Sequence, residues 1–376
     1  MEYKKCKLKE LLTIKNGKDH KNLAEGDYPV YGSGGYMRSV NSFLYDRKSI
    51  LLPRKGTLSN IQYVSGTPFW TVDTIYYTVL NEKLYDPYYL YLYLNSLDLS
   101  GYDSGASIPS MTSKTYYSLN IELPEKKIQT KVANIIRAYD NLIENNNKRI
   151  KLLEQMAENL YKEWFVRFRF PGYEDVGFEN GIPIGWKIKR IKDFGQVITG
   201  KTPSTEISSN YGDKYLFIKT PDMHDNMYVI DSSEKLSEHG NDVQKLKKLP
   251  RWSIMVSCIG TGGVVSINSK EAHTNQQINS IVLHDKNNIE WLFFVCKSLK
   301  TTIEMFGATG STMTNLSKGK FENLKILEPN LELIDKYHMY THDIFKEVEK
   351  LMYSNENLIN QRDLLLPRLM SGKLEV

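Results

Sequence analysis

One stretch of the sequence has the spacing of a phosphate-binding loop. The residues GQVITGKT (Gly195–Thr202) match the pattern G-x-x-x-x-G-K-[ST] letter for letter. In that pattern, backbone N–H groups and the lysine bind the phosphates of a nucleotide. MYVID (Met227–Asp231) adds an acidic residue after a short apolar run, as a magnesium-binding strand would. Nucleoside triphosphate hydrolysis is therefore the first chemical hypothesis.

The surroundings of this stretch argue against nucleotide binding. A phosphate loop follows a buried strand and opens a helix, whereas WKIKRIKDF (Trp186–Phe194) carries alternating charges. Pro203 and Ser204 predict a turn, and the β-branched interior QVIT favours a strand. A P-loop nucleoside triphosphatase stays an alternative. Tight ATP binding that is lost in Lys201→Ala would establish it.

No other grouping of reactive residues matches an active site. The seven histidines include no H-E-x-x-H motif or comparable ligand pair, so we predict no metal site. The GSGG run at 32–35 does not complete G-x-G-x-x-G because position 37 is Met. Glu125-Lys126-Lys127 fits the start of a helix better than the end of a nuclease motif. No motif of a DNA methyltransferase is present, and we predict neither a catalytic residue nor a cofactor.

The composition is that of a globular chain with two domains. The chain has 376 residues, and single cores rarely grow beyond about 250–300 residues. A net charge of +5 permits a polyanionic partner without requiring one. The three cysteines (Cys6, Cys258, Cys296) show no disulfide or metal spacing, which suits a reducing compartment. The polar start and the short apolar runs lead us to expect a cytoplasmic protein.

The chain repeats itself in order. GASIPSMTSKTYYSLNIELP (Gly105–Pro124) aligns without a gap with GSTMTNLSKGKFENLKILEP (Gly310–Pro329). Three further pairs align upstream: SILLPRKGT with SIMVSCIGT, TVDTIYYTVL with TNQQINSIVL, and KLKELLTIKNGK with RIKDFGQVITGK. Two copies of one mixed α and β fold are predicted, since short β-branched runs alternate with turn residues. Two apolar runs lie at equivalent places in the copies: YLYLYLNSL (Tyr89–Leu97) and EWLFFVCKSL (Glu290–Leu299). Each is predicted to be a buried helix or a buried strand, because periodicity does not separate the two for runs of this length. Their aromatic residues are expected in the core; the alternative is a platform on which bases stack.

A long segment with few helix breakers follows each copy. Positions that alternate by four and three residues predict a coiled-coil seam in both. They are Ile128, Val132, Ile135, Tyr139, Leu142, Asn146, Arg149, Leu153, Met156 and Leu160 in the first, and Ile344, Val348, Leu351, Asn355, Leu358, Arg362 and Leu365 in the second. Each seam contains one Asn and one Arg, and a buried Asn fixes register. We predict that the two helices pair antiparallel; the alternative is that each packs on its own domain.

The central run MAENLYKEWFVRFRFPGYE (Met156–Glu174), followed by GIPIGWKIKRIKDF, resembles the central joint of type I restriction-modification specificity subunits. The helix openings after LPEKK and LEPN and the closing LLLPRLMSGKLEV are similar too, so the resemblance covers the whole chain. It implies two target-recognition domains that read a split sequence in double-stranded DNA. It also implies two methyltransferase subunits docked on the helices, a motor-nuclease subunit, and no catalysis by this chain. The first copy departs in starting short, with Tyr3 in the place of Trp186, which we expect to trim a strand or loop.

The resemblance and the repeat together predict four segments. They are a first target-recognition domain (1–124), a central spacer helix (125–170), a second target-recognition domain (171–329) and a C-terminal spacer helix (330–376). The first seam would span about 50 Å at about 1.5 Å per residue. Since one turn of duplex spans about 34–36 Å, two domains on such a spacer would meet DNA more than one turn apart.

Candidate DNA contacts lie on polar loops at equivalent places in the two copies. They are Lys18, Arg54, Lys55, Thr57, Ser107, Ser110 and Thr112 in the first, and Lys201, Thr261, Gln276, Gln277, Asn279, Thr312 and Thr314 in the second. Arg can bond guanine bidentately, Gln and Asn suit adenine, and hydroxyls suit phosphates or bases. The GTGG run at 260–263 lacks the charges of Arg54 and Lys55, so the copies should read different bases.

Candidate partner-docking residues form the aromatic run that ends the central helix. They are Tyr161, Trp164, Phe165, Phe168 and Phe170. Aromatic residues are enriched in the cores of protein interfaces. The alternative for part of this run is packing against the second domain, and the remaining alternative for the whole chain is a coiled-coil scaffold that binds no DNA.

Overall fold

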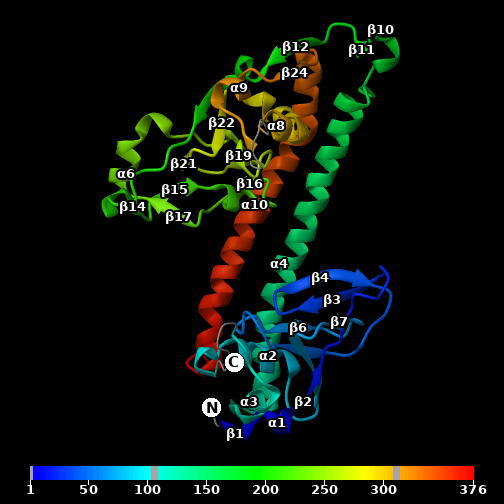
Figure 1. Cartoon of the computed structure of the whole chain (residues 1–376), viewed down its shortest axis with the longest axis vertical. Helices are drawn as coiled ribbons and strands as arrows, with labels where there is room; N and C mark the ends of the chain where they lie inside the picture. Colours follow the sequence, from blue (N-terminus) through cyan, green and yellow to red (C-terminus); the bar gives the residue numbers. More distant parts are fainter. Residues whose placement is uncertain (1–2, 103–108, 308–313) are drawn as a thin grey trace. The chain divides into compact units, whose positions relative to one another are not determined.

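The chain forms two compact units, and two long helices contribute to both. The computed structural model describes residues 3–102, 109–307 and 314–376. Unit 1 consists of Met1–Leu142 with Leu358–Val376, and unit 2 of Ile143–Asn357. Each unit holds one mixed α/β domain and a length of the helices α4 (Lys126–Tyr161) and α10 (Leu331–Met370) (Figure 1). The predicted fold class is confirmed.

The domain of unit 1 is built from short strands joined by turns. Its strands form a four-stranded sheet in the order β2-β8-β5-β6, a three-stranded sheet β4-β3-β7 and the pair β1-β9. Neighbouring strands are antiparallel except β3 and β7. The elements are β1 (Lys4–Lys7), α1 (Leu8–Leu11), β2 (Leu12–Asn16), β3 (Tyr28–Gly32), β4 (Gly35–Val40), β5 (Ser49–Pro53), β6 (Gln62–Val64), β7 (Trp70–Thr71), β8 (Ile75–Leu80), α2 (Pro87–Asn95), α3 (Ser113–Ser118) and β9 (Asn120–Leu123).

The ambiguous run YLYLYLNSL lies in a helix, α2, which packs on β5 and β6. Asp86 begins it, because its side chain accepts the backbone N–H groups of Tyr88 and Tyr89 at 2.9 and 3.1 Å, and Pro87 fits the first helical position. Tyr88 and Tyr89 are buried. Every residue of β5 is buried as well, which explains why its residues after Ser49 are all apolar rather than alternating with polar ones.

The domain of unit 2 has the same plan with larger sheets. Its main sheets run β13-β22-β18-β20-β16 and β14-β17-β15-β21, with the pairs β12-β24, β19-β23 and β10-β11. The elements are β10 (Phe178–Glu179), β11 (Ile182–Pro183), β12 (Lys187–Arg190), β13 (Gly195–Thr199), β14 (Tyr211–Gly212), β15 (Tyr215–Ile218), α5 (Thr220–Met223), β16 (Tyr228–Val229), β17 (Glu234–Leu236), α6 (Glu238–Val243), β18 (Ile254–Ser257), β19 (Ile259–Gly260), β20 (Val265–Asn268), β21 (Ala272–Thr274), β22 (Ile278–Leu283), α7 (Ile289–Ser298), α8 (Lys300–Gly307), β23 (Thr314–Asn315), α9 (Lys318–Glu322) and β24 (Lys325–Glu328).

The two domains repeat one topology, as the aligned segments predict. The order β2-β8-β5-β6 corresponds to β13-β22-β18-β20, and the pair β1-β9 corresponds to β12-β24. The parallel pair β3-β7 has its counterpart in β15-β21. EWLFFVCKSL, like its partner in unit 1, lies in a helix, α7, whose aromatic residues are buried. Within the described residues, unit 1 has no counterpart of the β10-β11 hairpin.

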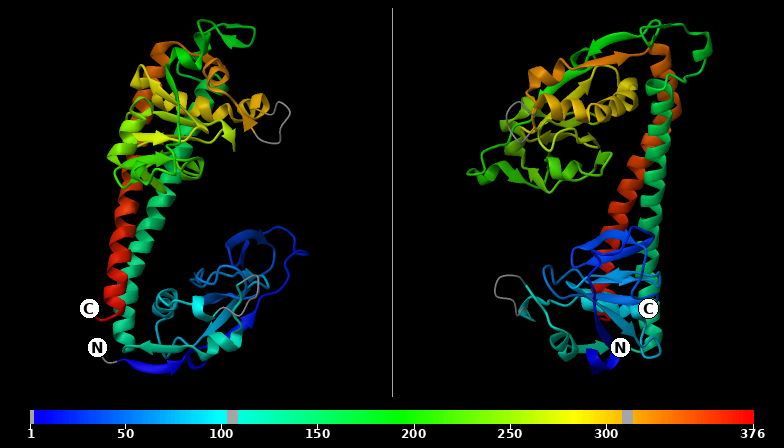
Figure 2. Two further views of the ribbon diagram at one scale, coloured as in Figure 1. Left: turned by 60° about the vertical axis from the view of Figure 1, so that its left-hand side comes forward. Right: turned by 45° about the vertical axis from the view of Figure 1, so that its right-hand side comes forward.

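The helices α4 and α10 pair antiparallel within each unit. In unit 2, Asn146 donates to Asn355 at 2.9 Å, and the Tyr337 hydroxyl donates to the Ala157 carbonyl at 2.9 Å, so residue numbers rise on one helix as they fall on the other. In unit 1, Arg362 donates to Asp140 at 2.7 Å. Both views of Figure 2 show the two helices side by side. The predicted antiparallel pairing is confirmed.

The predicted seam is correct at most of its positions. Val132, Asn146, Val348, Leu351 and Asn355 are buried. Three predicted seam residues are exposed: Leu142 by 51%, Met156 by 58% and Arg149, whose side chain is 52% exposed. Ala157 is buried next to Met156, because a helix of 3.6 residues per turn drifts away from a seam of period 3.5. Across residues 3–102, 109–307 and 314–376, no helix is both long enough and apolar enough to span a membrane.

Candidate nucleic-acid interface

The predicted polar loops of unit 1 lie next to each other in the fold. The loop after β5 begins with Arg54, whose backbone N–H donates to the Thr74 carbonyl at 2.8 Å. Lys55 forms an antiparallel bridge with Ser110. The Gly56 N–H donates to the Pro109 carbonyl at 2.9 Å. The structure therefore brings Arg54–Thr57 and the segment that begins at Pro109 together at one end of β5 and β8.

The equivalent loops of unit 2 meet in the same way. The Cys258 N–H donates to the Gln277 carbonyl at 2.7 Å, as Arg54 does to Thr74. The strands β19 and β23 place Ile259 opposite Asn315, and these two residues align with Lys55 and Ser110, which form the bridge in unit 1. Gly56 and Gly260 align in the repeat and have φ angles of +88° and +79°. This left-handed conformation disfavours side chains, so both loops need glycine at this turn.

Lys18 and Lys201 occupy the same backbone position in the two units. The Lys18 N–H donates to the Thr71 carbonyl at 2.8 Å, and the Lys201 N–H donates to the Thr274 carbonyl at 2.9 Å. The preceding glycines allow this close approach, since a Cβ would lie 2.0 Å from a backbone oxygen at Gly17 and 2.2 Å at Gly200. Both lysine side chains are exposed. The fold thus presents one solvated cation at the same end of each domain.

The remaining predicted DNA contacts differ in how far they reach solvent. Lys55, Thr57, Thr112, Thr261 and Gln276 are exposed, and Arg54, Ser110 and Gln277 are partly buried. The Thr112 hydroxyl caps α3 by accepting the Thr115 N–H at 3.2 Å. Asn279 lies inside the sheet with 3% of its surface exposed, and its amide oxygen accepts the Thr199 hydroxyl at 2.6 Å. Ser107 and Thr312 lie outside the described residues, and Thr314 is placed only by its strand.

The phosphate-loop pattern does not fold as a phosphate loop. Gly195–Thr199 is the strand β13, and no helix follows it before Pro203. The N–H groups of Gly200 and Lys201 donate to the carbonyls of Ile278 and Thr274, so they are not free to bind a phosphate. The structure gives no support to the triphosphatase alternative.

Comparison with known proteins identifies the family. The family model described as "Type I restriction modification DNA specificity domain" matches residues 1–155 and 183–361, which is most of the chain and includes both repeats. The chain belongs to this family. Its members are specificity subunits, which are not themselves catalytic, and the resemblance seen in the sequence is confirmed.

Named relatives of this specificity subunit agree with the assignment. The type I restriction enzyme HindI specificity subunit of Haemophilus influenzae is 31% identical, over 83% of this chain and 81% of that protein. The MjaIX specificity subunit of Methanocaldococcus jannaschii is 26% identical, over 95% and 86%. The crystal structure of an S subunit from M. genitalium has the same fold, with a TM-score of 0.66 at 15% identity, over 98% of this chain and 96% of that one.

The aromatic run of this specificity subunit packs into the core of unit 2. Lys162–Val166 forms a π-helical turn, closed by the Arg167 N–H donating to the Lys162 carbonyl at 2.9 Å. Tyr161, Trp164, Phe165 and Phe170 are each at most 8% exposed, and Phe168 is partly buried. The rings of Tyr161 and Phe294 stack with their centroids 5.5 Å apart. Burial raises the pKa of the Tyr161 hydroxyl to about 12. The partner-docking role of the aromatic run stays a prediction. The exposed residues of this segment are Lys162, Val166, Arg167 and Arg169.

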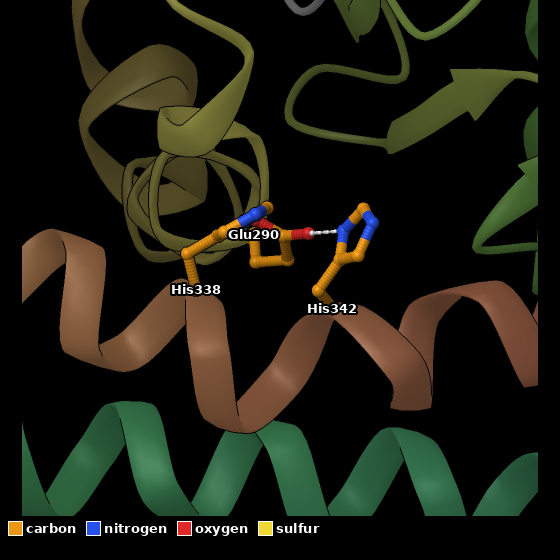
Figure 3. Close-up of side chains that lie close together, drawn as sticks. All are labelled: Glu290, His338 and His342. Atoms are coloured by element: carbon orange, nitrogen blue, oxygen red, sulfur yellow. Dashed lines mark hydrogen bonds and ion pairs between the residues drawn. The ribbon is translucent and has the colours of Figure 1, made fainter.

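One group of side chains in the specificity subunit is missed by the sequence reasoning. His338 and His342 are one turn apart on α10, and the Nδ1 atoms of both contact the carboxylate of Glu290 on α7, at 2.8 and 2.9 Å (Figure 3). Glu290, His338 and His342 form a group that could hold a metal ion, which the expectation of no ligand pair did not take into account. The sequence H-M-Y-T-H does contain a signal for His338 and His342, since two residues four apart in a helix lie on the same face. Glu290 lies too far away in the sequence to be recognised beforehand.

Proposed function

We propose that this specificity subunit reads a split target in double-stranded DNA, one part with each recognition domain. The duplicated end of each domain carries the proposal, since identical backbone contacts there hold different side chains. Methylation, and cleavage where a nuclease is present, would be the work of partner subunits. The proposed domains are 1–124 and 171–329, with spacers at 125–170 and 330–376.

The two kinds of DNA contact fall on different residues. Lys18 and Lys201 lie at one aligned position, are exposed and suit phosphate contacts that position each domain. Side chains that differ between the domains suit base readout: Arg54 and Lys55 in unit 1, and Gln276 and Gln277 in unit 2. Thr57, Ser110, Thr112, Thr261 and Thr314 complete the set. Asn279 is left out because its amide is buried.

The helices are the proposed docking site for two methyltransferase subunits, through which a motor-nuclease subunit would join. Three large apolar side chains on α4 support this proposal, because they are more than half exposed: Leu142, Leu152 and Met156. Exposed apolar side chains grouped on one element are typical of interaction surfaces. The aromatic run beside them would hold the shape of the joint, while Val166, Arg167 and Arg169 supply its surface.

Salt-dependent DNA binding by the complex with methyltransferase subunits tests the proposal. Lys18→Ala and Lys201→Ala should weaken binding to every sequence equally and lower the log-salt slope by about 0.9 each. Arg54→Ala should weaken the free energy of binding to the target DNA by about 1–3 kcal/mol and relax the preference at one base position.

The chain offers matched controls. Lys83 and Lys286 are exposed, aligned in the repeat, and lie beyond the opposite ends of β8 and β22. Alanine at either position should leave affinity and slope unchanged. A salt-independent response, or no duplex binding with methyltransferase subunits present, would favour the coiled-coil scaffold.

A further inference from the structure

Glu290 is a buried carboxylate that, within the described residues, forms no ion pair with a lysine or an arginine. Its side chain is 1% exposed, and within the described part of the chain its only ion-pair partners are His338 and His342. Burying an ionised carboxylate is costly unless a positive charge compensates it. Neutral imidazoles supply hydrogen bonds but no charge. A bound cation would supply both charge and ligation.

The two imidazoles and the carboxylate are arranged as ligands of one ion. One ligand atom from each of the three residues can be chosen so that all three lie within 4.8 Å of one another. Around a tetrahedral Zn²⁺ with bonds of about 2.0–2.2 Å, ligand atoms lie about 3.4 Å apart, which small side-chain rotations would reach. Two histidines four apart on a helix with one remote carboxylate form a known zinc-binding set.

The rings of His338 and His342 are 19% and 24% exposed, whereas the carboxylate between them is buried. Their ring centroids lie 4.4 Å apart, and both rings are on the side of α10 that faces away from α4 (Figure 3). An ion can therefore arrive from solvent, and its fourth position can hold a water.

The equivalent place in unit 1 has different chemistry. The alignment of α2 with α7 puts Tyr88 in the place of Glu290, and the alignment of α4 with α10 puts Arg137 in the place of His342. There the Arg137 guanidinium lies 4.7 Å from the Tyr88 ring centroid. The Tyr88 hydroxyl donates to the Asp140 carboxylate of α4, so this contact between the two helices has no imidazole and no pair of ligand histidines around its carboxylate. The ligand set in unit 2 goes beyond what the shared fold requires.

The geometry points to a binding site for a divalent transition-metal ion, Zn²⁺ in the first place, formed by Glu290, His338 and His342. It would cross-link α7 to α10 in unit 2. Two nitrogens and a carboxylate favour zinc-like ions over Mg²⁺ or Ca²⁺, which prefer oxygen ligands alone. Without metal, the Nδ1–H of each histidine donates to the Glu290 carboxylate. On binding, Nδ1 would ligate the metal, and the ring proton would be carried by Nε2 after exchange with solvent.

Metal titration of the chelator-treated, full-length chain tests this site. We expect about one Zn²⁺ per chain by calorimetry, a visible absorption band when Co²⁺ is used, and a melting temperature that rises with Zn²⁺ but not with Mg²⁺. Glu290→Gln, His338→Gln and His342→Gln should each lower the affinity by about 100-fold or more and abolish the melting response. His239→Gln, an exposed histidine on α6, should change neither.

Far-UV circular dichroism in chelator shows whether each variant is folded, and glutamine suits a helix. Three results would overturn the proposed site: no stoichiometric binding of Zn²⁺, Zn²⁺ binding that persists after all three substitutions, or a melting temperature that does not change when Zn²⁺ is added. The last, with variants that melt early even in chelator, would leave Glu290 and its histidines as a hydrogen-bonded contact only.

Discussion

Replacing Asn146 with leucine should destabilise the helix pair of unit 2, although it makes the seam more apolar. Asn146 is 9% exposed, and its amide donates to Asn355 at 2.9 Å. Asn355 in turn donates to Asn147 at 2.8 Å. Asn146→Leu therefore leaves the amide oxygen of Asn355 buried without its donor. An unsatisfied buried acceptor costs about 1–3 kcal/mol, of which the added leucine recovers a part.

The double variant Asn146→Leu with Asn355→Leu removes both buried polar groups. The amide oxygen of Asn147 then loses its donor, but Asn147 is exposed and water can replace it. Replacing buried polar partners together is often neutral or stabilising, at the expense of register. We expect the double variant to be at least as stable as the wild type, with a coupling free energy of about 0.5–3 kcal/mol between the two substitutions.

Urea unfolding followed by tryptophan fluorescence measures this effect in the right place, because four of the five tryptophans belong to unit 2: Trp164, Trp186, Trp252 and Trp291. Asn159→Leu, at an exposed position of α4, is the control and should change the free energy of unfolding by less than about 0.5 kcal/mol. Additive single effects, or a single Asn146→Leu that stabilises unit 2, would refute the reasoning.

Three further predictions concern the domain of unit 2, each measured as a free energy of unfolding. Gly200→Ala should destabilise the domain by about 1–3 kcal/mol, because the added Cβ would lie 2.2 Å from a backbone oxygen. The control Gly319→Ala, in open space on α9, should be neutral or slightly stabilising. Equal changes in the free energy of unfolding for the two variants would contradict this prediction. Trp164→Ala should cost about 3–5 kcal/mol because its ring is 6% exposed, and a cost below about 1 kcal/mol would show that the joint is not packed as described. Burial lowers the pKa of His273 to about 4 in the folded state from 6.5. The unfolded chain therefore binds the proton more readily, and stability should fall by up to about 3 kcal/mol as the pH drops from about 6.5 to about 4; a pH profile that is unchanged in His273→Gln would exclude this cause.

The sequence was most informative where a pattern recurs. The aligned segments predicted matching strands and helices because equal spacing in both copies constrains the topology. The seam predicted the antiparallel pairing of the two helices, to which the Asn146–Asn355 hydrogen bond belongs. A strict 4-3 alternation misplaced Met156, since the helix period is 3.6 and not 3.5. The buried run YLYLYLNSL could not be resolved by periodicity alone, and Asp86 with Pro87 at its start was the deciding signal.

Residues whose roles depend on distant neighbours could not be predicted in this way. Asn279 has the side chain of a base reader, but the pairing of β13 with β22 places it against Thr199 inside the sheet. The aromatic run is amphipathic in sequence, yet four of its five rings are buried in the core, two of them within the π-helical turn. Glu290 meets its histidines only because α7 packs on α10.

Mapping methylated adenines across the genome of cells that co-express this chain with methyltransferase subunits tests the central claim most directly. Two domains that each read part of the target predict a split motif, with two short specified parts separated by an unread gap of fixed length. Arg54→Ala should then relax one part and leave the other intact. A contiguous motif, or no motif at all, would contradict the account.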